Sequence, residues 1–360
     1  MLTLRKLPGR VLYLGIVAII LWYLSQYLGN KKTFDPYYFR VVMLTGIAVI
    51  CAVSLNLVNG VTGQFSIGHA GFMAVGAYAG AAVTVFGQLG LFPPLAKANV
   101  WVQQSAMLSA LLAGGFAAAL AGWIVGLPSL RLRGDYLAIV TLGFGEIIRV
   151  AILNIDAVGG ASGFSGYSPP GGSRISIPSL TTFFWVYGTV FVVVILSRNL
   201  LSSLHGLAFF SIREDEIAAE AMGVPTTRVK VTAFVMSAFF AGVAGALFAH
   251  YDSYLKPDTF NFIRSIEFVA MVVLGGMGSI SGSIVGAAIL TAAPEGLRVA
   301  LPMLSKRGLI PPTVQLDLVR FFLYALLLIV LMLTRPQGIF GTREIGLLRV
   351  FRKRRVEAEA

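Results

Sequence analysis

The chain has 360 residues, of which 57% are hydrophobic and only 12% are charged. This composition excludes an ordinary soluble domain, in which roughly 25% of the residues are charged. The formal net charge of +12 does not by itself indicate a nucleic-acid partner, because membrane proteins collect Lys and Arg in their cytoplasmic loops. The sequence has no basic face interleaved with aromatic residues, so no nucleic acid is expected as a partner. Cys51 is the single cysteine and excludes an intrachain disulfide.

Apolar runs of membrane-crossing length, or nearly so, recur along the chain. They are Val11–Leu28, Val41–Val58, Ile67–Phe86, Ser105–Leu127, Leu137–Leu153, Thr181–Leu196, Val231–His250, Ile266–Ala293 and Leu318–Thr334. Backbone groups in lipid must be satisfied within their own segment, so these runs are expected to be helices, and their continuity excludes a transmembrane β-barrel. The sequence predicts an all-α, polytopic helical membrane protein with about 8–10 transmembrane segments of about 20 residues, some of them Gly-broken or re-entrant. Residues 1–342 would form a single transmembrane domain.

The positive charges at the two ends of the chain indicate its orientation. Arg5, Lys6 and Arg10 precede the first run and place the N-terminus in the cytoplasm by the positive-inside rule. We interpret Val11–Leu28 as a crossing and not as a signal peptide, because it is too long and no small-residue cleavage site follows it. Residues 343–360 form a basic tail that is also expected in the cytoplasm. Counting crossings then makes 154–179 an extracytoplasmic loop and 206–230 a cytoplasmic loop.

Glycine interrupts the run Ile266–Ala293 and recurs at helical spacing elsewhere. Two cytoplasmic termini require this run to contribute an even number of passes. Each Gly in a helix costs about 1 kcal/mol relative to Ala, so we predict two segments joined at the break, either a re-entrant hairpin or two short crossings. The candidate hinge residues are Gly275, Gly276, Gly278 and Gly282. Gly-x-x-x-Gly pairs that begin at Gly76, Gly122 and Gly282 predict close helix contacts.

Polar residues interleaved with glycine lie between two apolar runs, from Asn56 to His69. Polar groups at membrane depth are costly and tend to mark a substrate path. An ordinary cytoplasmic turn, with His69 donating to a nearby carbonyl, is the alternative. The candidate path residues are Asn56, Asn59, Gln64, Ser66, His69, Thr141 and Glu146.

Glu146 and Arg149 are three residues apart and share a helix face, which favours a structural ion pair, with a gate as the alternative. The sequence shows no nucleophile–base arrangement and no metal-ligand constellation, so neither catalytic residues nor a bound metal is expected.

The loop 206–230 carries a compact charged segment. Ser211-x-x-Glu214 has the form of a capping box, the acidic residues that follow it suit a first helical turn, and Gly223 is placed as a C-terminal cap. These signals predict one helix, Ser211–Gly223, too short and too charged to cross the membrane. Complete start and stop signals and small apolar residues favour a docking helix. A solvated connector between two crossings is the alternative.

Several motifs in this order resemble the branched-chain amino-acid ABC-transporter permease family of the LivM type. They are NLVNGVTGQFSIGHAG at Asn56–Gly71, LPSLRLRGDYLAIVTLG at Leu127–Gly143, VLGGMGS at Val273–Ser279, and EIAAEAMG at Glu216–Gly223, which resembles the Glu-Ala-Ala…Gly loop of ABC-importer permeases with Ile217 inserted. The resemblance covers roughly Val41 to Gly338. It implies that the loop helix docks on an ATPase subunit. The coupling residues would be Ser211, Arg213, Glu214, Asp215, Glu216, Ala219, Glu220 and Gly223.

The resemblance implies a multi-pass permease of the bacterial inner membrane, surrounded by lipid, that imports branched-chain or related apolar amino acids. Its partners would be a sister permease in a heterodimer, two ABC ATPases and an extracytoplasmic solute-binding protein. The solute-binding protein could contact the loop Val158–Gly172. The alternative for this loop is a disordered linker. No G-x-x-x-x-G-K-[ST] loop occurs, so no cofactor is expected on this chain and ATP would be used by the partners. A same-family permease for urea or short amides, an ion-coupled secondary amino-acid transporter, and a channel or scaffold without energy coupling are the alternatives. No residue in the sequence identifies the cargo.

Overall fold

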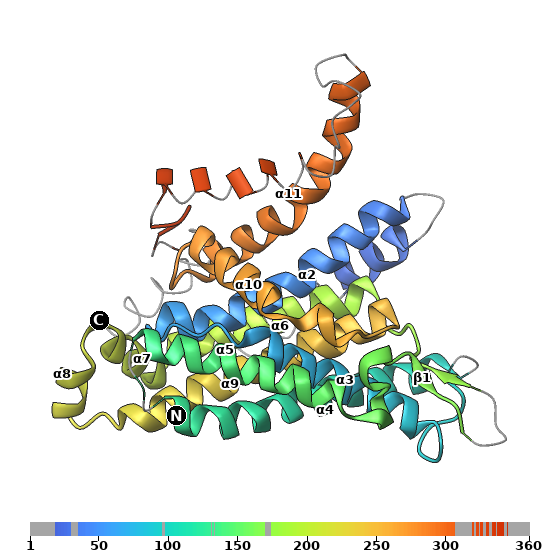
Figure 1. Ribbon diagram of the computed structural model, residues 1–360, viewed down its shortest axis with the longest axis horizontal. Helices are drawn as coiled ribbons and strands as arrows, with labels where there is room; N and C mark the ends of the chain where they lie inside the picture. Colours follow the sequence, from blue (N-terminus) through green and yellow to red (C-terminus); the bar gives the residue numbers. More distant parts are fainter. Residues whose placement is uncertain are drawn as a thin grey trace, which may run out of the picture.

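The computed structural model describes residues 19–29, 35–95, 98–130, 132, 134–169 and 174–306, together with scattered residues between 319 and 344. Residues 11–18 of the predicted run Val11–Leu28, about half of the run Leu318–Thr334, and all of the tail 343–360 except Glu344 lie outside these residues. The described chain is mostly helical and contains one two-stranded sheet (Figure 1).

Seven helices within the described ranges are long and apolar enough to cross a membrane. They are α2 (Pro36–Asn56), which continues as the π-helix η2 (Leu57–Val61), and α3 (His69–Gly87), α4 (Val100–Ser129), α5 (Asp135–Leu153), α6 (Phe183–Leu201), α9 (Thr226–Asp252) and α11 (Ile280–Lys306). The shorter helices are Ile19–Leu28, α7 (Leu204–Glu214), α8 (Glu216–Ala221) and α10 (Phe262–Gly275). The predicted all-α, multi-pass membrane architecture is confirmed.

Burial separates central from peripheral helices. In α2, 78% of the most apolar stretch is buried inside the protein, and in α3 and α9 the share is 72%, whereas in α6 it is 17%. The first three therefore form the interior of the bundle, while α6 presents most of its apolar surface outward. Figure 1 shows α7 and α8 at one end of the bundle and the β-sheet at the opposite end.

Glycine sets the distance between α3, α4 and α9, which pack against one another. A Cβ added at Gly76 would lie 2.2 Å from the Cα of Gly242, and one added at Gly114 would lie 2.6 Å from the carbonyl oxygen of Gly76. Only glycine permits backbones to approach so closely. The Gly-x-x-x-Gly predictions are confirmed as contacts: a Cβ at Gly122 would lie 2.5 Å from that of Ala238, and one at Gly282 would lie 2.3 Å from the carbonyl oxygen of Gly275.

The run Ile266–Ala293 forms two segments, as predicted. Helix α10 ends at Gly275 and α11 begins at Ile280, and the connection contains Gly276 at φ +115° and Gly278 at φ +89°. At roughly 1.5 Å per residue α10 is about 20 Å long, which is shorter than the hydrocarbon of a bilayer, about 30 Å thick. The hinge role of these glycines remains a prediction.

A carboxylate from the C-terminal part of the chain caps α11. Glu344 accepts hydrogen bonds from the backbone N–H of Ile280 at 2.7 Å and of Ser281 at 3.2 Å, and from the Ser281 hydroxyl at 2.5 Å. The backbone N–H of Ile339 donates to the carbonyl of Leu274 at 2.8 Å, so the chain also pairs with the end of α10. Free N–H groups at a helix start favour such an anionic partner.

The loop 154–179 is folded in the residues that the structure describes, 154–169 and 174–179. It contains the 3-10 turns η3 (Asp156–Val158) and η4 (Gly160–Ser162) and the antiparallel pair β1 (Gly166–Tyr167) and β2 (Ile175–Ser176). Phe164 is buried, exchanges two backbone hydrogen bonds of 2.8 Å with Leu255, and stacks on Tyr78 and Phe86. Because of these contacts, the alternative of a disordered linker is wrong for the described part of this loop.

Replacing Gly242 with Ala is expected to destabilise the bundle, because the new Cβ would lie 2.4 Å from both the Ala118 Cβ and the Gly114 carbonyl oxygen. Overpacking of this kind costs about 1–3 kcal/mol. Gly188→Ala on α6 is the matched control, because nothing lies within 4 Å of its added Cβ. Thermal unfolding of the purified variants in detergent should show a lower midpoint for Gly242→Ala and an unchanged or higher one for Gly188→Ala. Equal midpoints would contradict the packing account.

Candidate functional site

The polar stretch after α2 is a buried, irregular connection. Helix α2 widens into the π-helix η2, and the chain then runs without helix to α3, which begins at His69. The Asn59 side chain holds this connection together, because its amide nitrogen donates to the Ser66 carbonyl and its amide oxygen accepts from the Ser66 N–H, both at 3.1 Å. Short π-helical turns are frequent at functional sites.

Two other predicted path residues join this connection to neighbouring elements. The Asn56 side chain accepts a hydrogen bond of 2.8 Å from the backbone N–H of Gly278, in the break between α10 and α11. The Thr141 hydroxyl on α5 accepts from the Ile67 N–H at 3.1 Å and donates to the Ala138 carbonyl. The structure therefore brings Asn56, Asn59, Ser66 and Thr141 together as the residues that hold one loop in place. Their role in a substrate path remains a prediction.

His69 lies in the interior of the bundle. Its Nε2 is 2.8 Å from the Ser54 hydroxyl, its ring packs edge-on against Phe268, and the Ser237 hydroxyl donates to the Ser54 carbonyl. The imidazole thus links α2 to α3 and touches α10. Its Nε2 has the Ser54 hydroxyl as a side-chain partner, and the ring also forms a hydrogen bond with the backbone of Cys51, so a contact with a nearby carbonyl, as in the turn alternative, is present as well.

Gln64 differs from its neighbours. Its side chain is buried, and neither Nε2 nor Oε1 has a hydrogen-bond partner in the described part of the chain. A buried amide without partners is costly, and in native proteins such groups are few. Among the predicted path residues, Gln64 therefore has the most hydrogen-bonding groups available. They could bind a ligand or form hydrogen bonds in a second conformation.

Glu146 makes none of the hydrogen bonds described for this loop, although its neighbour Gly145 packs against Gly68. It pairs with Arg149 at 2.7 Å, and the same guanidinium reaches Asp258 in the 3-10 turn η5 (Pro257–Phe260) at 3.1 Å. The ion pair predicted from the spacing is present, and Asp258 extends it to a second element. Asp258 was not predicted as a partner, because its contact with Arg149 spans 109 residues.

The predicted helix Ser211–Gly223 is wrong at its start. Ser211 lies inside α7, where its hydroxyl donates to the Ala208 carbonyl, so it does not cap a helix. The chain becomes extended at Asp215, whose side chain accepts from the N–H groups of Ile217 and Ala218 and caps α8. Burial of Phe209 and Ile212 keeps α7 helical through the predicted start.

The predicted end of that helix is confirmed. Gly223 has φ +85°, and its N–H and that of Val224 donate to the carbonyls of Glu220 and Ala219. The coupling residues are therefore divided between two elements. Ser211, Arg213 and Glu214 belong to α7, while Glu216, Ala219 and Glu220 belong to α8, with Asp215 between them and Gly223 after them.

One charge-assisted hydrogen bond and one ion pair join these short helices to the membrane-spanning bundle. Arg213 on α7 donates to the Gly60 carbonyl in η2 at 3.0 Å, and a Cβ at Gly278 would lie 2.7 Å from the same guanidinium. On α8, Glu216 forms a 2.6 Å ion pair with Lys230, a buried residue in the first turns of α9. Residues Ile217 and Met222 of this segment are 67% and 85% exposed. One face of α8 is thus anchored to the bundle, while apolar side chains remain uncovered in this chain.

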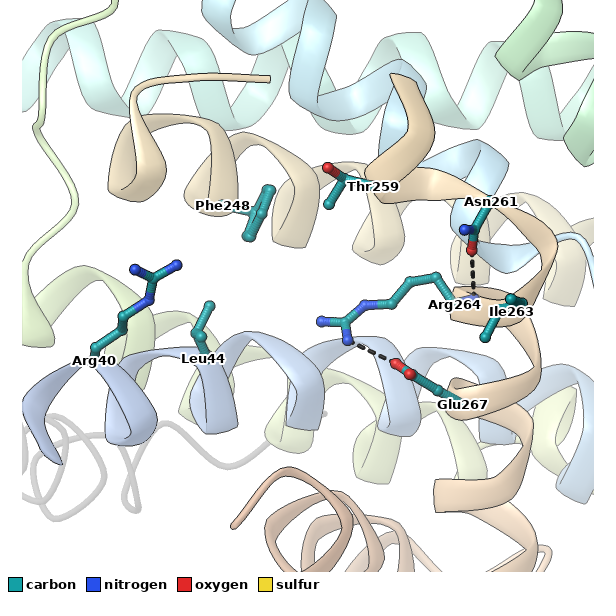
Figure 2. A pocket seen from close by; sticks show the side chains of 8 residues that line it. All are labelled: Arg40, Leu44, Phe248, Thr259, Asn261, Ile263, Arg264 and Glu267. Atoms are coloured by element: carbon teal, nitrogen blue, oxygen red, sulfur yellow. Dashed lines mark hydrogen bonds and ion pairs between the residues drawn. The ribbon is translucent and has the colours of Figure 1, made fainter. Parts of the chain in front are cut away.

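A cavity of about 290 Å³, lined by both polar and apolar side chains, lies at the opposite end of α9, between α2, η5 and α10. Figure 2 shows the Arg264 guanidinium extended across it toward Arg40, with Leu44 and Phe248 between them and Glu267 paired with Arg264. The cavity was not predicted from the sequence, because its residues are spread from α2 to α10. In the described residues no three His, Cys, Asp or Glu side chains come together as metal ligands.

The fold and the site define a multi-pass helical membrane domain whose central helices are linked to a short exposed helix at one end. The model of the family "Branched-chain amino acid transport system / permease component" matches residues 37–331, and the chain belongs to that family. The high-affinity branched-chain amino acid transport system permease protein LivM of Salmonella typhimurium is 36% identical over 312 residues, 76% of this chain and 70% of that protein. LivM of Escherichia coli K12 is 35% identical over 337 residues, 83% of this chain and 74% of that protein.

The permease protein LivH of Escherichia coli K12 is also similar, at 26% identity over 339 residues, which are 86% of this chain and 97% of LivH. No solved structure matches the chain at a significant level.

Asn59→Leu is expected to lower stability, because it leaves the N–H and C=O of buried Ser66 without their partner. The loss should be about 1–3 kcal/mol for each unsatisfied group. Gln64→Leu is the contrasting change, because it removes two buried polar atoms that have no described partner. Its unfolding midpoint in detergent should equal or exceed that of the parent protein. A large loss of stability in Gln64→Leu would show that the amide has a structural partner.

Proposed function

We propose that the chain is a transmembrane permease subunit of an ABC importer that carries branched-chain or related apolar amino acids across a bacterial inner membrane. The observation that carries the proposal is the joint presence of the family's transmembrane core and the anchored helix α8 at one end of it. Because the sequence has no P-loop, the energy would come from ATPase subunits. The ends of the chain and α8 would then lie in the cytoplasm.

The ionic contacts of α7 and α8 support a mechanism of alternating access. An ATPase that moves α8 would pull on Lys230 through Glu216, at the base of the central helix α9. The same motion would reach η2 and the break between α10 and α11 through Arg213. Rigid movement of packed helices about such a break is a recognised form of gating.

The partners follow from the same family. LivM and LivH are both named permease proteins of one high-affinity transport system, which supports a heterodimer of this chain with a sister permease. Two ATPases would dock at the α8 end. A solute-binding protein would deliver cargo at the opposite end, where the loop with Phe164 is folded against α3 and pairs with Leu255 through an isolated β-bridge.

ATPase docking is tested with Ile217→Glu and Met222→Glu, which place charge on the exposed apolar side chains of this segment. Both variants should insert into the membrane normally but lose the ATPase in a pull-down from membranes that contain the partner subunits. Leu91→Glu is the control, because Leu91 is exposed at the opposite end of the bundle. If both variants retain the ATPase, the docking role is wrong.

Energy coupling is tested with Arg213→Gln and Lys230→Met, which break the contacts to Gly60 and to Glu216. The complex should still assemble and hydrolyse ATP, but import should fall by about tenfold, within the usual range of coupling energies. Arg228→Gln, an exposed position of α9, should import normally. Import that is abolished by an uncoupler at constant ATP would instead support a secondary transporter.

A further inference from the structure

We propose that the cavity between Arg40 and Arg264 is a binding site for the head group of a zwitterionic, apolar amino acid. This inference rests on the proposed function and adds a site to it. The cavity lies at the end of the bundle away from α8. That end would face the outside of the cell. It would receive the cargo before the pore opens.

The charged groups of the cavity match the two charges of an α-amino acid. Arg40 lies 3.5 Å from Asp252 and its side chain is 60% exposed, so this ion pair is weak and leaves guanidinium N–H groups free to bind a carboxylate. Arg264 and Glu267 form a 2.7 Å pair whose side chains are 32% and 37% exposed. The Glu267 carboxylate offers a partner for an ammonium group, and partial burial strengthens these interactions relative to open water.

Apolar side chains complete the site. Leu44 and Phe248 lie between the two guanidinium groups, and Ile263 lines the rim (Figure 2). The cavity of about 290 Å³ is at the lower limit of small-molecule pockets, about 300 Å³. It therefore suits a small solute with one polar end and one apolar end. Asn261 and Thr259 supply further hydrogen-bonding groups at the polar side.

The residues that frame the cavity are held in place by other contacts. Arg264 is fixed by the Asn261 side chain, which accepts from its backbone N–H at 3.1 Å, and its guanidinium stacks over Phe268 at 5.2 Å. Phe268 in turn packs against the ring of His69. A ligand bound at Arg264 is therefore two side chains away from the buried loop that begins at Asn56.

The test uses the complete transporter in membranes from cells that produce this chain with its partner subunits. A leucine analogue that carries a diazirine is activated by light, and labelled peptides are mapped by mass spectrometry. Labelling is expected on the segments that contain Leu44, Phe248 or Ile263. Leucine should compete with the label, whereas leucinamide, which lacks the carboxylate, should not.

Variants then connect the site to transport. Arg264→Gln should reduce labelling and raise the KM of leucine import by about tenfold, the effect of losing one charge-assisted hydrogen bond. Ile263→Trp fills the rim without removing a charge and should also reduce labelling and raise the KM. This variant keeps the test available if Arg264→Gln fails to fold. The matched control is Arg298→Gln, since Arg298 and Glu295 form an i,i+3 pair outside the cavity. Its KM should stay within about twofold of the parent value.

The site would be overturned if import is normal but the label falls on other segments, or if Arg264→Gln does not reduce the label. Either result would leave the proposed function standing. If phosphatidylethanolamine vesicles displace the label and excess leucine does not, the cavity is a lipid site. That result would also overturn the proposed amino-acid site. If the parent complex imports no apolar amino acid, the proposed function fails. Leucine-sensitive label in the cavity would still support the site in that case.

Discussion

Contact between the backbones of α3, α4 and α9 at Gly76, Gly114 and Gly242 is the constraint on which the rest of the structure depends. Lipid tails are as apolar as leucine, so helices in a membrane associate through close packing and not through the hydrophobic effect. The glycines supply that packing because they have no side chain at the points where the backbones meet. Helices α3 and α9, together with α2, form the interior of the bundle, and α4 packs against α3 and α9.

Helix α9 belongs to this interior and reaches both functional regions. Lys230, near its start, pairs with α8, and Phe248, near its end, lines the cavity beside Arg264. The two residues are roughly 27 Å apart along the helix at about 1.5 Å per residue. In the proposed mechanism, one continuous helix of this length would connect the docking of a partner at one end of the bundle with the proposed solute site at the other.

The sequence predicted those features whose causes are local. Long apolar runs specify helices because lipid offers backbone groups no other partner, and the glycines after Val273 end one helix and allow the next to begin. Gly223 was predicted as a cap because a left-handed residue after a helix is a property of a few neighbouring atoms. Ser211 was predicted wrongly because Asp215 provides a competing cap, and burial of Phe209 and Ile212 decides between the two.

Contacts between distant parts of the chain were beyond sequence reasoning. The Arg213 contact with Gly60 spans 153 residues, and the partner of Asn56 lies 222 residues away. The sequence shows that these side chains are polar and that their burial at membrane depth costs free energy. The local pattern does not predict which distant residue each one contacts. The Arg264 cavity was missed for the same reason, since its parts come from α2, α9, η5 and α10.

The cap that Glu344 places on α11 has a consequence for how the protein is made. The helix start at Ile280 emerges from the ribosome 64 residues before the carboxylate that satisfies its N–H groups. During that interval these amides have to be met by water or by the insertion machinery, because hydrocarbon offers them nothing. The break between α10 and α11 therefore reaches its final hydrogen bonding only late in synthesis, when the C-terminal segment arrives to close it.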